Sequence, residues 1–445
     1  MSNVWPASAS RDSTGALSIG GVDVRDTAAQ FGTPVFILDE QEVRSRAREY
    51  RQAASQVGAR QVYYAAKAFL STTVARWVVE EGLGIDVASG GELAVALRAG
   101  VPGRDLLLHG NNKSMAEIEA AIEAGVGRIV LDSFEEIVRV ADAASRFGVV
   151  QPVLVRLTIG VQAHTHEFIA TAHEDQKFGF SVASGAAQEA LRRIVMLPSL
   201  EFRGLHSHIG SQIFDAHGFQ EAAVRIVAFM GQMSTEFGIS CAELDLGGGM
   251  GIAYLESDDP LSIDELASQV ALAVASDCQA IGLAVPALAF EPGRAIIGPP
   301  GVTLYEIGTV KAVQTDDGVR TYISVDGGMS DNIRTALYDA EYTVALASRT
   351  SDAELMLVRV VGKHCESGDI LIREAWLPSD LVPGDLLAVA ATGAYCRSMA
   401  SNYNYLPRPA VIGVKAGVST VILRRETLED LLALDPGADS GFQRQ

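Results

Sequence analysis

The feature that most constrains the fold is an alternation of short strand-like segments with longer helix-like segments between about residues 60 and 295. The short segments are rich in aliphatic, β-branched and aromatic residues, whereas stretches such as 133–146 and 216–236 are amphipathic with helical periodicity. Eight strand–helix units predict a (β/α)8 barrel, and a doubly wound open sheet is the alternative. The predicted strands are residues 62–65, 85–88, 106–109, 128–132, 153–158, 202–206, 242–246 and 287–290.

After residue 300 the pattern changes to strand-like runs separated by turns, which predicts a mainly β domain. Its predicted strands are residues 302–312, 320–325, 355–361, 387–391 and 410–414. The expected organisation is an N-terminal segment (1–33) that packs with the β domain, a barrel (34–299) and a C-terminal β domain (300–445).

Composition and charge argue against several classes of partner. The chain has 445 residues, of which 48% are hydrophobic and 20% are charged, so it can bury a large core. The net charge of −20 disfavours nucleic acids and anionic lipid surfaces. Because we find no bilayer-length apolar run and no signal-peptide pattern, we expect a soluble cytoplasmic protein. The cysteines form no CxxC pair, so we expect free thiols, a reducing compartment and no metal site.

Side chains that could react or bind a ligand lie at the ends of the predicted barrel strands. Lys67 ends an apolar run, and an exposed strand-end lysine is the simplest interpretation. A lysine held in a dry pocket can instead lose its proton and attach covalently to a carbonyl, for which pyridoxal 5′-phosphate (PLP) is the common partner. The other candidates are Asp86, His109, the segment 206–212, the run 247–251 and the segment 291–294. Because barrel enzymes build their sites at the carboxyl ends of the strands, Lys67 and these residues together predict one site.

The glycine run 247–251 follows the seventh predicted strand, where barrels often bind phosphate through backbone amides. A flexible turn is the alternative, and the spacing does not match a dinucleotide fingerprint. Glu291 could accept a hydrogen bond from a protonated pyridine nitrogen, and Arg294 could bind a phosphate or carboxylate. His208 could stack on a cofactor ring, although a core histidine is the usual finding.

Three polar clusters lie in the predicted β domain, at residues 326–338, 364–369 and 393–403. Each alone is typical of a charged turn. Together they supply a cation, carboxylates, a thiol and phenols, a set that suits a zwitterionic substrate.

From about Gly32 to Pro409 the chain resembles the fold-type III PLP-dependent decarboxylases, and within them the diaminopimelate decarboxylases. The resemblance implies an alanine-racemase-like PLP-binding barrel plus a β domain, in a homodimer with shared active sites. Thr335 and Cys396 depart from the family pattern, where Pro and Gly are common. The matching segments are YYAAKA, GIDVASGGEL, HGNNKS, THEF with KFGF, GLHSHIGSQ, LDLGGGMGI, EPGRAI, DGGMSDNIRTALY, CESGD and GAYCRSMASNYN.

The resemblance also implies a role for individual residues. Lys67 would attach the cofactor, His208 would stack on its ring and Glu291 would pair with its nitrogen. The residues expected to contact the cofactor are Lys67, Asp86, His208, Ser211, Gly247, Gly248, Gly249, Glu291, Gly293, Arg294 and Tyr395. The residues expected to contact the substrate are Arg294, Arg334, Tyr338, Glu366 and Tyr395. The residues expected to be catalytic are Lys67, His208 and Cys365.

The implied reaction is decarboxylation of meso-2,6-diaminopimelate to L-lysine and CO2, the last step of lysine biosynthesis. Cys365 and Glu366 would come from the neighbouring subunit, and Glu366 would bind the distal ammonium. Arg334 would bind the distal carboxylate, and Cys365 or Lys67 would supply the proton that replaces CO2. The alternative is a PLP-dependent decarboxylase of arginine, ornithine or carboxynorspermidine. A racemase on a similar barrel and a non-catalytic PLP carrier are the remaining rivals.

Overall fold

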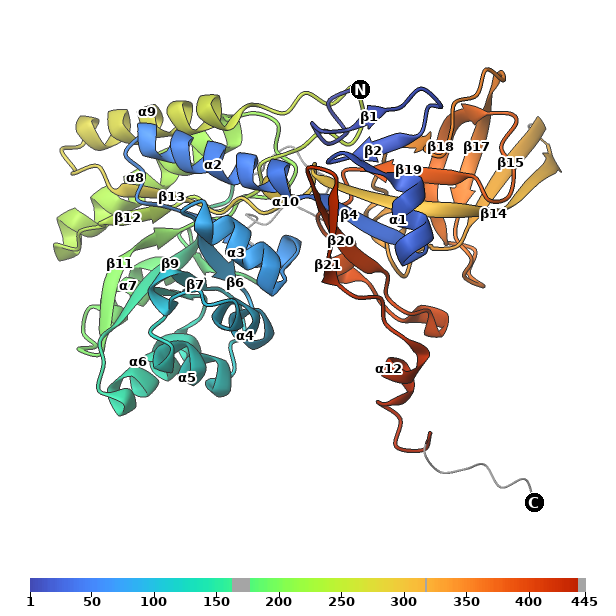
Figure 1. Ribbon diagram of the computed structural model, residues 1–445. Coiled ribbons are helices and arrows are strands. Elements are labelled where there is room, and N and C mark those ends of the chain that lie inside the picture. Colours follow the sequence, from blue (N-terminus) through green and yellow to red (C-terminus); the bar gives the residue numbers. More distant parts are fainter. Residues whose placement is uncertain (162–176, 317, 439–445) are drawn as a thin grey trace. The chain divides into compact units, whose positions relative to one another are not determined.

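The computed structural model describes residues 1–161, 177–316 and 318–438, and the chain divides into two compact units (Figure 1). The barrel unit consists of Arg44–Ile252 and Asp259–Ile296. The β unit consists of Met1–Val43, Ala253–Asp258 and Ile297–Gln445. The predicted boundary between residues 33 and 34 differs from the observed one, because Val35–Asp39 (β4) pairs with strands of the β unit.

The barrel unit contains a closed barrel of parallel strands, as the alternation in the sequence predicted. All eight predicted strands form, and each pairs with the next along the chain. The last strand also pairs with the first, which excludes the open doubly wound sheet. A short strand, β10 (Phe180–Ser181), adds beside the fifth. The barrel strands are β5 (Gln61–Ala65), β6 (Gly84–Val87), β7 (Leu106–Leu108), β8 (Arg128–Leu131), β9 (Gln151–Thr158), β11 (Leu200–His206), β12 (Glu243–Asp245) and β13 (Ala287–Phe290).

Side chains fill the inside of the barrel, so it is a packed core rather than a pore. One interior cluster comes from five different strands and is at most 8% exposed. Because parallel strands are covered on both faces, their sequences are nearly continuous apolar runs. The members of this cluster are Tyr63, Leu107, Val130, Leu154 and Ala289.

Helices surround the barrel, and several begin at a serine (Figure 1). The side chains of Ser71, Ser89, Ser114, Ser133 and Ser262 each accept a hydrogen bond from a backbone N–H in the first helical turn. Such N-caps stabilise a helix by about 1 kcal/mol and fix where it starts after the preceding strand. The helices are α2 (Glu40–Gln56), α3 (Thr72–Glu80), α4 (Gly90–Arg98), α5 (Met115–Glu123), α6 (Phe134–Phe147), α7 (Ala186–Ile194), α8 (His217–Phe237), α9 (Ile263–Ala280) and α10 (Arg294–Ile297).

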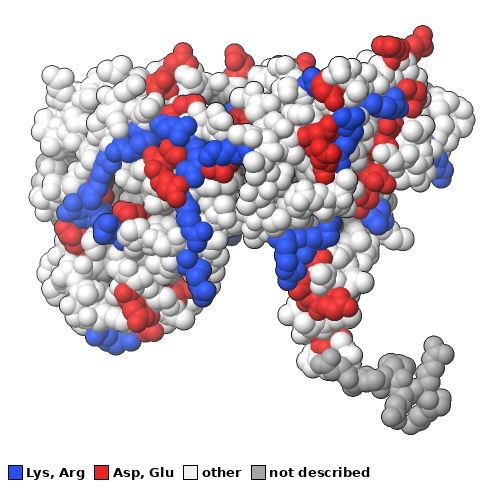
Figure 2. Space-filling view, in the orientation of Figure 1, with Lys and Arg blue, Asp and Glu red and all other residues white. Residues whose placement is uncertain are grey.

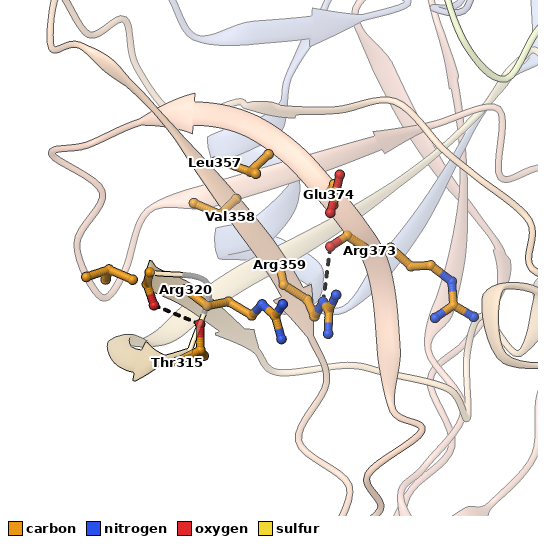
Figure 3. A pocket seen from close by; sticks show the side chains of 9 residues that line it. Thr315, Arg320, Leu357, Val358, Arg359, Arg373 and Glu374 are labelled. Atoms are coloured by element: carbon orange, nitrogen blue, oxygen red, sulfur yellow. Dashed lines mark hydrogen bonds between the residues drawn. The ribbon is translucent and has the colours of Figure 1, made fainter.

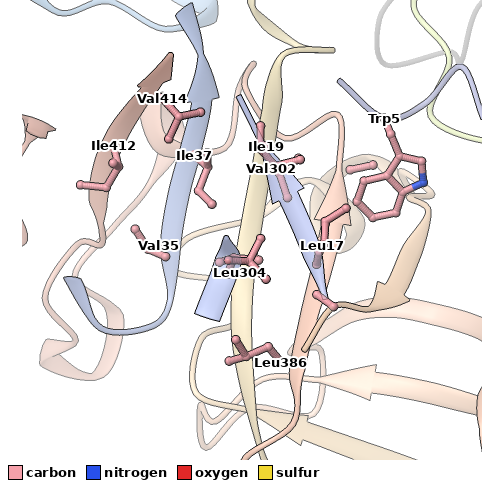
Figure 4. Packing of buried hydrophobic residues seen from close by; sticks show 14 of the residues in the cluster. Trp5, Leu17, Ile19, Val35, Ile37, Val302, Leu304, Leu386, Ile412 and Val414 are labelled. Atoms are coloured by element: carbon pink, nitrogen blue, oxygen red, sulfur yellow. The ribbon is translucent and has the colours of Figure 1, made fainter. Parts of the chain in front are cut away.

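The β unit is built on a mixed sheet, and its core contains residues of strands from both ends of the chain (Figure 4). Leu17 and Ile19 of the N-terminal segment pack with Val302 and Leu304, and all four side chains are fully buried. The sheet strands are β4, β14 (Gly301–Thr315), β15 (Gly318–Val325), β16 (Val344–Leu346), β17 (Leu355–Val361), β18 (Ile370–Pro378), β19 (Leu386–Ala390), β20 (Ala410–Lys415) and β21 (Val418–Leu423). The remaining elements are β1 (Ser10–Arg11), β2 (Leu17–Ile19), β3 (Val22–Asp23), α1 (Val24–Phe31), α11 (Arg334–Tyr338) and α12 (Leu428–Leu432).

On the face drawn in Figure 2, basic side chains commonly lie beside acidic ones. Arg44 of α2, for example, pairs with both Glu80 and Glu81, and Arg48 also pairs with Glu81. Across residues 1–161, 177–316 and 318–438, no helix has the length and hydropathy needed to cross a bilayer.

Candidate active site

Lys67 lies directly after the first barrel strand. β5 ends at Ala65, and the chain makes a short turn over Ala66–Ala68. The expectation of a buried amine is wrong for this chain by itself, because the Lys67 side chain is exposed. The cause is local: the flanking alanines are buried, and the lysine between them extends from the open end of the strand. An exposed amine remains accessible to an incoming carbonyl compound.

Glu291 lies directly after β13 and is buried between two histidines. His109 Nε2 is 2.5 Å from Glu291 Oε1, and His206 Nε2 is 3.3 Å from Glu291 Oε2. The two imidazole rings meet edge to face, with centroids 4.6 Å apart. Since His109 follows β7 and His206 ends β11, three distant strand ends converge on one carboxylate.

Burial and their mutual contacts set the protonation of these three groups. Burial lowers the pKa of His109 to about 4 and also lowers the pKa of His206, so both rings are neutral near pH 7. Burial alone would raise the pKa of Glu291, but the two histidines lower this pKa by more than burial raises it. The net pKa therefore lies well below its usual range. Glu291 is therefore an anion held by two N–H donors.

The same three side chains bring potential metal-ligand atoms within 4.8 Å of one another. Tetrahedral zinc with bonds of about 2.0–2.1 Å would separate its ligand atoms by roughly 3.3 Å. The contact of 2.5 Å between His109 and Glu291 is shorter than that separation, so it is a hydrogen bond rather than an edge of a metal site.

Two further carboxyl groups, Asp86 of β6 and Asp245 of β12, lie at this end of the barrel. Burial and the Glu291 charge raise the pKa of both well above the usual range, and the Lys67 charge opposes this at Asp86. Asp86 Oδ1, Asp245 Oδ2 and His206 Nδ1 are buried without a hydrogen-bond partner among the described residues. Unpaired buried polar atoms of this kind indicate a place for a polar ligand or for water.

The loop Gly247–Gly249 follows β12 and packs backbone against backbone. A Cβ atom on Gly248 would lie 2.2 Å from the carbonyl oxygen of Glu291, and one on Gly249 would lie 2.4 Å from that of Gly210. Gly249 also has a φ of 111°, which a residue with a side chain rarely adopts. The loop therefore has to be glycine, and this leaves its amide groups unobstructed by side chains.

A cation lies beside this loop. Arg294 Nη2 donates a hydrogen bond of 2.8 Å to Ser211 Oγ. The backbone N–H of Ile213 donates to the carbonyl oxygen of Gly249, which links the loops after the sixth and seventh strands. A Cβ on Gly293 would lie 3.0 Å from the carbonyl oxygen of Ala65, so this loop also approaches the first strand closely. The loops after strands 6, 7 and 8 thus gather an arginine, a hydroxyl and glycine amides, which suits a phosphate group.

His208 is half-buried and lies against the glycine loop. Its Nδ1 accepts a hydrogen bond of 3.2 Å from the backbone N–H of Gly248. Burial, the Lys67 charge and the Arg156 charge lower its pKa well below the usual range, so the ring is neutral. A neutral imidazole with a fixed orientation can stack on a flat ligand ring.

In the β unit, Arg334 begins α11 and is only 5% exposed. Its Nη1 donates hydrogen bonds to Tyr254 Oη at 2.8 Å and to Tyr342 Oη at 2.5 Å. The guanidinium carbon lies 4.9 Å and 5.5 Å from the centroids of these two rings. Sequence reasoning missed both tyrosines. Tyr254 is 80 residues away from Arg334, so only the fold brings the two together.

The turn between β17 and β18 presents Cys365 and Glu366, both of which are exposed. The turn is anchored by His364, whose Nε2 is 2.9 Å from Ser330 Oγ, and by Asp369, which accepts a hydrogen bond of 2.6 Å from the backbone N–H of Met329. The two exposed side chains therefore sit on a turn that is fixed at its base.

Tyr338 and Tyr395 are half-buried in the β unit, and Tyr395 has a φ of 60°. The motif at residues 165–168 lies outside the described residues.

A model of the family described as "Pyridoxal-dependent decarboxylase, pyridoxal binding domain" matches residues 41–298. The chain belongs to the pyridoxal-dependent decarboxylases. A diaminopimelate decarboxylase of Mycobacterium leprae is 57% identical over 98% of this chain and 93% of that protein. One of Mycobacterium tuberculosis is 56% identical over 97% of this chain and 98% of that protein. The crystal structure of a diaminopimelate decarboxylase from M. jannaschii with L-lysine has a TM-score of 0.89 at 30% identity, covering 97% of this chain and 98% of that chain.

The barrel residues of this pyridoxal-dependent decarboxylase fit PLP. Lys67 offers an accessible amine, and the glycine loop with Arg294 and Ser211 offers a cradle for the phosphate. Glu291 is an anion whose oxygens have further acceptor capacity beside the two histidines. Asp86 Oδ1 and Asp245 Oδ2 are buried without a hydrogen-bond partner among the described residues, and the Glu291 charge acts on both carboxyl groups, so polar atoms of a ligand could bind beside that carboxylate.

A pocket elsewhere in this decarboxylase contains none of the predicted site residues (Figure 3). It lies on the sheet formed by β14, β15, β17 and β18, where Arg359 Nε donates to the carbonyl oxygen of Arg373 at 3.1 Å. Arg373 is in turn paired with Asp339, so this surface is partly neutralised.

Proposed function

We propose that this decarboxylase converts meso-2,6-diaminopimelate to L-lysine and CO2. The observation that carries the proposal is Arg334, a buried guanidinium in a chain whose relatives are diaminopimelate decarboxylases. Diaminopimelate has a second carboxylate at the end remote from the reaction, and ornithine and arginine lack one. A buried arginine is suited to bind that group, because guanidinium and carboxylate match in charge and bidentate geometry.

The barrel residues divide the work of holding the cofactor. Bound PLP supplies an electron sink for the electron pair left when a carboxylate departs as CO2. Lys67 Nζ would be the attachment point for its aldehyde carbon. The Glu291 carboxylate would accept a hydrogen bond from the pyridine N–H, and the neutral His208 ring would lie against the ring face.

The β-unit residues hold the substrate, and either one of them or Lys67 returns a proton. Arg334 and Tyr338 bind the distal carboxylate, and Arg294 and Tyr395 contact the cofactor–substrate region. The proton that replaces CO2 comes from Cys365 Sγ or Lys67 Nζ, and both are exposed and so free to approach a ligand.

We further propose that the enzyme is a cytoplasmic homodimer in which each subunit completes the other's active site. Cys365 and Glu366 support this, because both are exposed on a turn that is fixed at its base. In the partner's site, Glu366 would accept the distal ammonium group. An exposed free thiol is also typical of a reducing compartment.

The test is CO2 release by PLP-loaded enzyme from meso-diaminopimelate, ornithine, arginine and carboxynorspermidine. We expect turnover of diaminopimelate to exceed that of the other three by orders of magnitude. Borohydride treatment should trap the cofactor on Lys67, located by peptide mass analysis. Faster CO2 release from one of the basic amino acids would assign the enzyme to the alternative substrate class, and racemisation without CO2 would exclude decarboxylation.

A further inference from the structure

The side chain of Arg334 is held on one side only. Its Nη1 carries two hydrogens, and Tyr254 Oη and Tyr342 Oη accept one hydrogen bond each, at 2.8 Å and 2.5 Å. The tyrosine rings meet edge to face at 5.1 Å, and the guanidinium carbon lies over both of them. All three side chains are at most 7% exposed. The guanidinium is therefore fixed in position and in plane.

The opposite edge of the guanidinium, formed by Nε and Nη2, has no partner in the part of the chain that the structure describes. Among the residues that the structure describes, Arg334 has no carboxylate within ion-pair distance and no hydrogen-bond acceptor at Nε or Nη2. These two nitrogens form the edge that binds a carboxylate through two parallel hydrogen bonds. A buried cation without an anion is unfavourable, so this arrangement calls for an anionic ligand.

The chain makes an unusual detour to form this arrangement. Tyr254 lies in the stretch Ala253–Asp258, which belongs to the β unit although barrel residues flank it on both sides. Its carbonyl oxygen accepts hydrogen bonds from the backbone N–H and the Oγ1 of Thr343, at 3.1 Å and 2.8 Å. Its own N–H donates to Asp258 Oδ2 at 2.9 Å. Tyr254 is thus fastened directly beside Tyr342.

We propose that Tyr254 and Tyr342 are positioning residues that hold Arg334 so that its Nε–Nη2 edge binds the distal carboxylate of the substrate. This inference rests on the proposed function, which assigns that carboxylate to Arg334. The ligand class is an amino acid whose remote end carries a carboxylate. The two phenols act through the arginine and do not touch the reacting atoms.

The test uses Tyr254→Phe and Tyr342→Phe, which keep the rings and remove the hydroxyls. Each hydroxyl accepts a hydrogen bond from a charged group, so we expect KM for meso-diaminopimelate to rise about tenfold or more in each variant. We expect kcat to change by less than about twofold, because the distal carboxylate is bound equally in the ground state and the transition state. Tyr50→Phe, which alters a buried tyrosine of α2, is the matched control and should leave KM unchanged.

Two inhibitors separate positioning from simple packing. L-Lysine keeps the carboxylate that Arg334 binds, whereas cadaverine has none. In the tyrosine variants we expect the inhibition constant of L-lysine to rise in parallel with KM and that of cadaverine to stay constant. Equal weakening of both inhibitors, or an equal loss of kcat and cofactor affinity, would show general loosening of the fold and overturn the inference. Calorimetric binding of L-lysine to the PLP-loaded variants gives the same information without turnover.

Arg334→Lys connects the two proposals. It should raise KM for diaminopimelate by itself, and in that background the tyrosine substitutions should add little, because the group they orient is gone. If Arg334→Lys leaves KM unchanged, the assignment of Arg334 in the proposed function fails. If Arg334→Lys raises KM but the tyrosine variants do not, only the positioning inference fails.

Discussion

At the scale of single residues, the protonation of Glu291 is the property on which the barrel site depends. A buried carboxyl group would normally take up a proton, and it would then donate a hydrogen bond instead of accepting one from a pyridine N–H. His109 and His206 prevent this by offering one N–H each at 2.5 Å and 3.3 Å. Both rings can do so while neutral, because burial lowers their pKa values.

We therefore expect His109→Ala to raise the pKa of Glu291. In the native protein this pKa is depressed, so the carboxylate persists as the pH falls; in the variant, protonation should begin at a higher pH. The infrared C=O stretch of the protonated carboxyl group, in cofactor-free protein labelled with 13C-glutamate, measures this directly. With PLP bound, we expect kcat to fall by about tenfold or more, most strongly at the acidic end of the pH profile.

His217→Ala is the control for this experiment, because His217 is exposed at the start of α8. It should change neither the infrared band nor the pH profile. An unchanged Glu291 titration in a folded His109→Ala protein would show that the histidine does not control the carboxylate.

At the scale of elements, the loop after β12 is a tightly constrained connection of the barrel. Because a Cβ on Gly248 would lie 2.2 Å from a backbone oxygen, Gly248→Ala has to move either this loop or the one that follows β13. We expect PLP to bind more weakly and activity to fall by about 100-fold, as a displacement near 1 Å can cause. The increase in melting temperature on adding PLP should shrink accordingly.

Gly91→Ala provides the comparison, since its added Cβ would meet only Ser89 Oγ at 3.7 Å within the first turn of α4. Alanine favours helix, so this variant should keep full PLP affinity and equal or slightly higher stability. A Gly248→Ala protein with native PLP affinity would rule out the loop as part of the cofactor cradle.

The opposite ends of the barrel strands carry a cluster with a structural role. Glu243 at the start of β12 is 7% exposed and binds Arg128 through two hydrogen bonds of 2.6 Å and 2.9 Å. Arg60 and Arg203 also pair with it. Burial opposes the charge on Glu243, but the arginines hold its pKa below the usual range.

We expect Glu243→Gln to reduce the free energy of unfolding by about 2–3 kcal/mol near pH 7, because it leaves a buried arginine without its anion. A depressed carboxyl pKa stabilises the fold above the unfolded pKa of about 4.3, and this contribution disappears as the pH falls through the folded value. The stability gap between native protein and variant should therefore narrow below about pH 4 in urea titrations. Glu201→Gln, at a half-exposed pair, should change stability by less than about 1 kcal/mol, and a similar loss there would contradict the special role of Glu243.

At the scale of the whole molecule, the barrel was predictable because each strand is a short apolar run followed by an amphipathic helix. The β unit was harder to predict from the sequence. β4 resembles a barrel strand in sequence, and only its pairing with β14 and β20 assigns it to the β unit. β18 mixes charged and apolar residues, because parts of both its faces are exposed.

The candidate site shows the same division. Lys67, Glu291 and the glycine run could be found because they follow recognisable strands. The contact of Glu291 with His109 could not, because it depends on how strands far apart in the sequence close into a barrel. Tyr254 carries no local signal at all.

The proposed sharing of active sites between subunits makes a prediction about mixtures of inactive subunits. Lys67→Ala would remove the attachment point of a subunit's own site, and Glu366→Ala would remove the group that it gives to its partner. If the variants exchange freely, half of the dimers are mixed and each mixed dimer has one intact site, so about a quarter of native activity should return. No recovery after verified subunit exchange would indicate that each subunit builds its site alone.

The detour of residues 253–258 limits how this enzyme can be re-engineered. A designer who transplants the β unit from a relative with a different substrate preference would naturally cut the chain at residues 43 and 296. Such a chimaera would keep residues 253–258, including Tyr254, from the host protein. The residues around position 334, which Tyr254 contacts, would come from the donor protein. Any swap meant to alter selectivity has to move three pieces of the gene together.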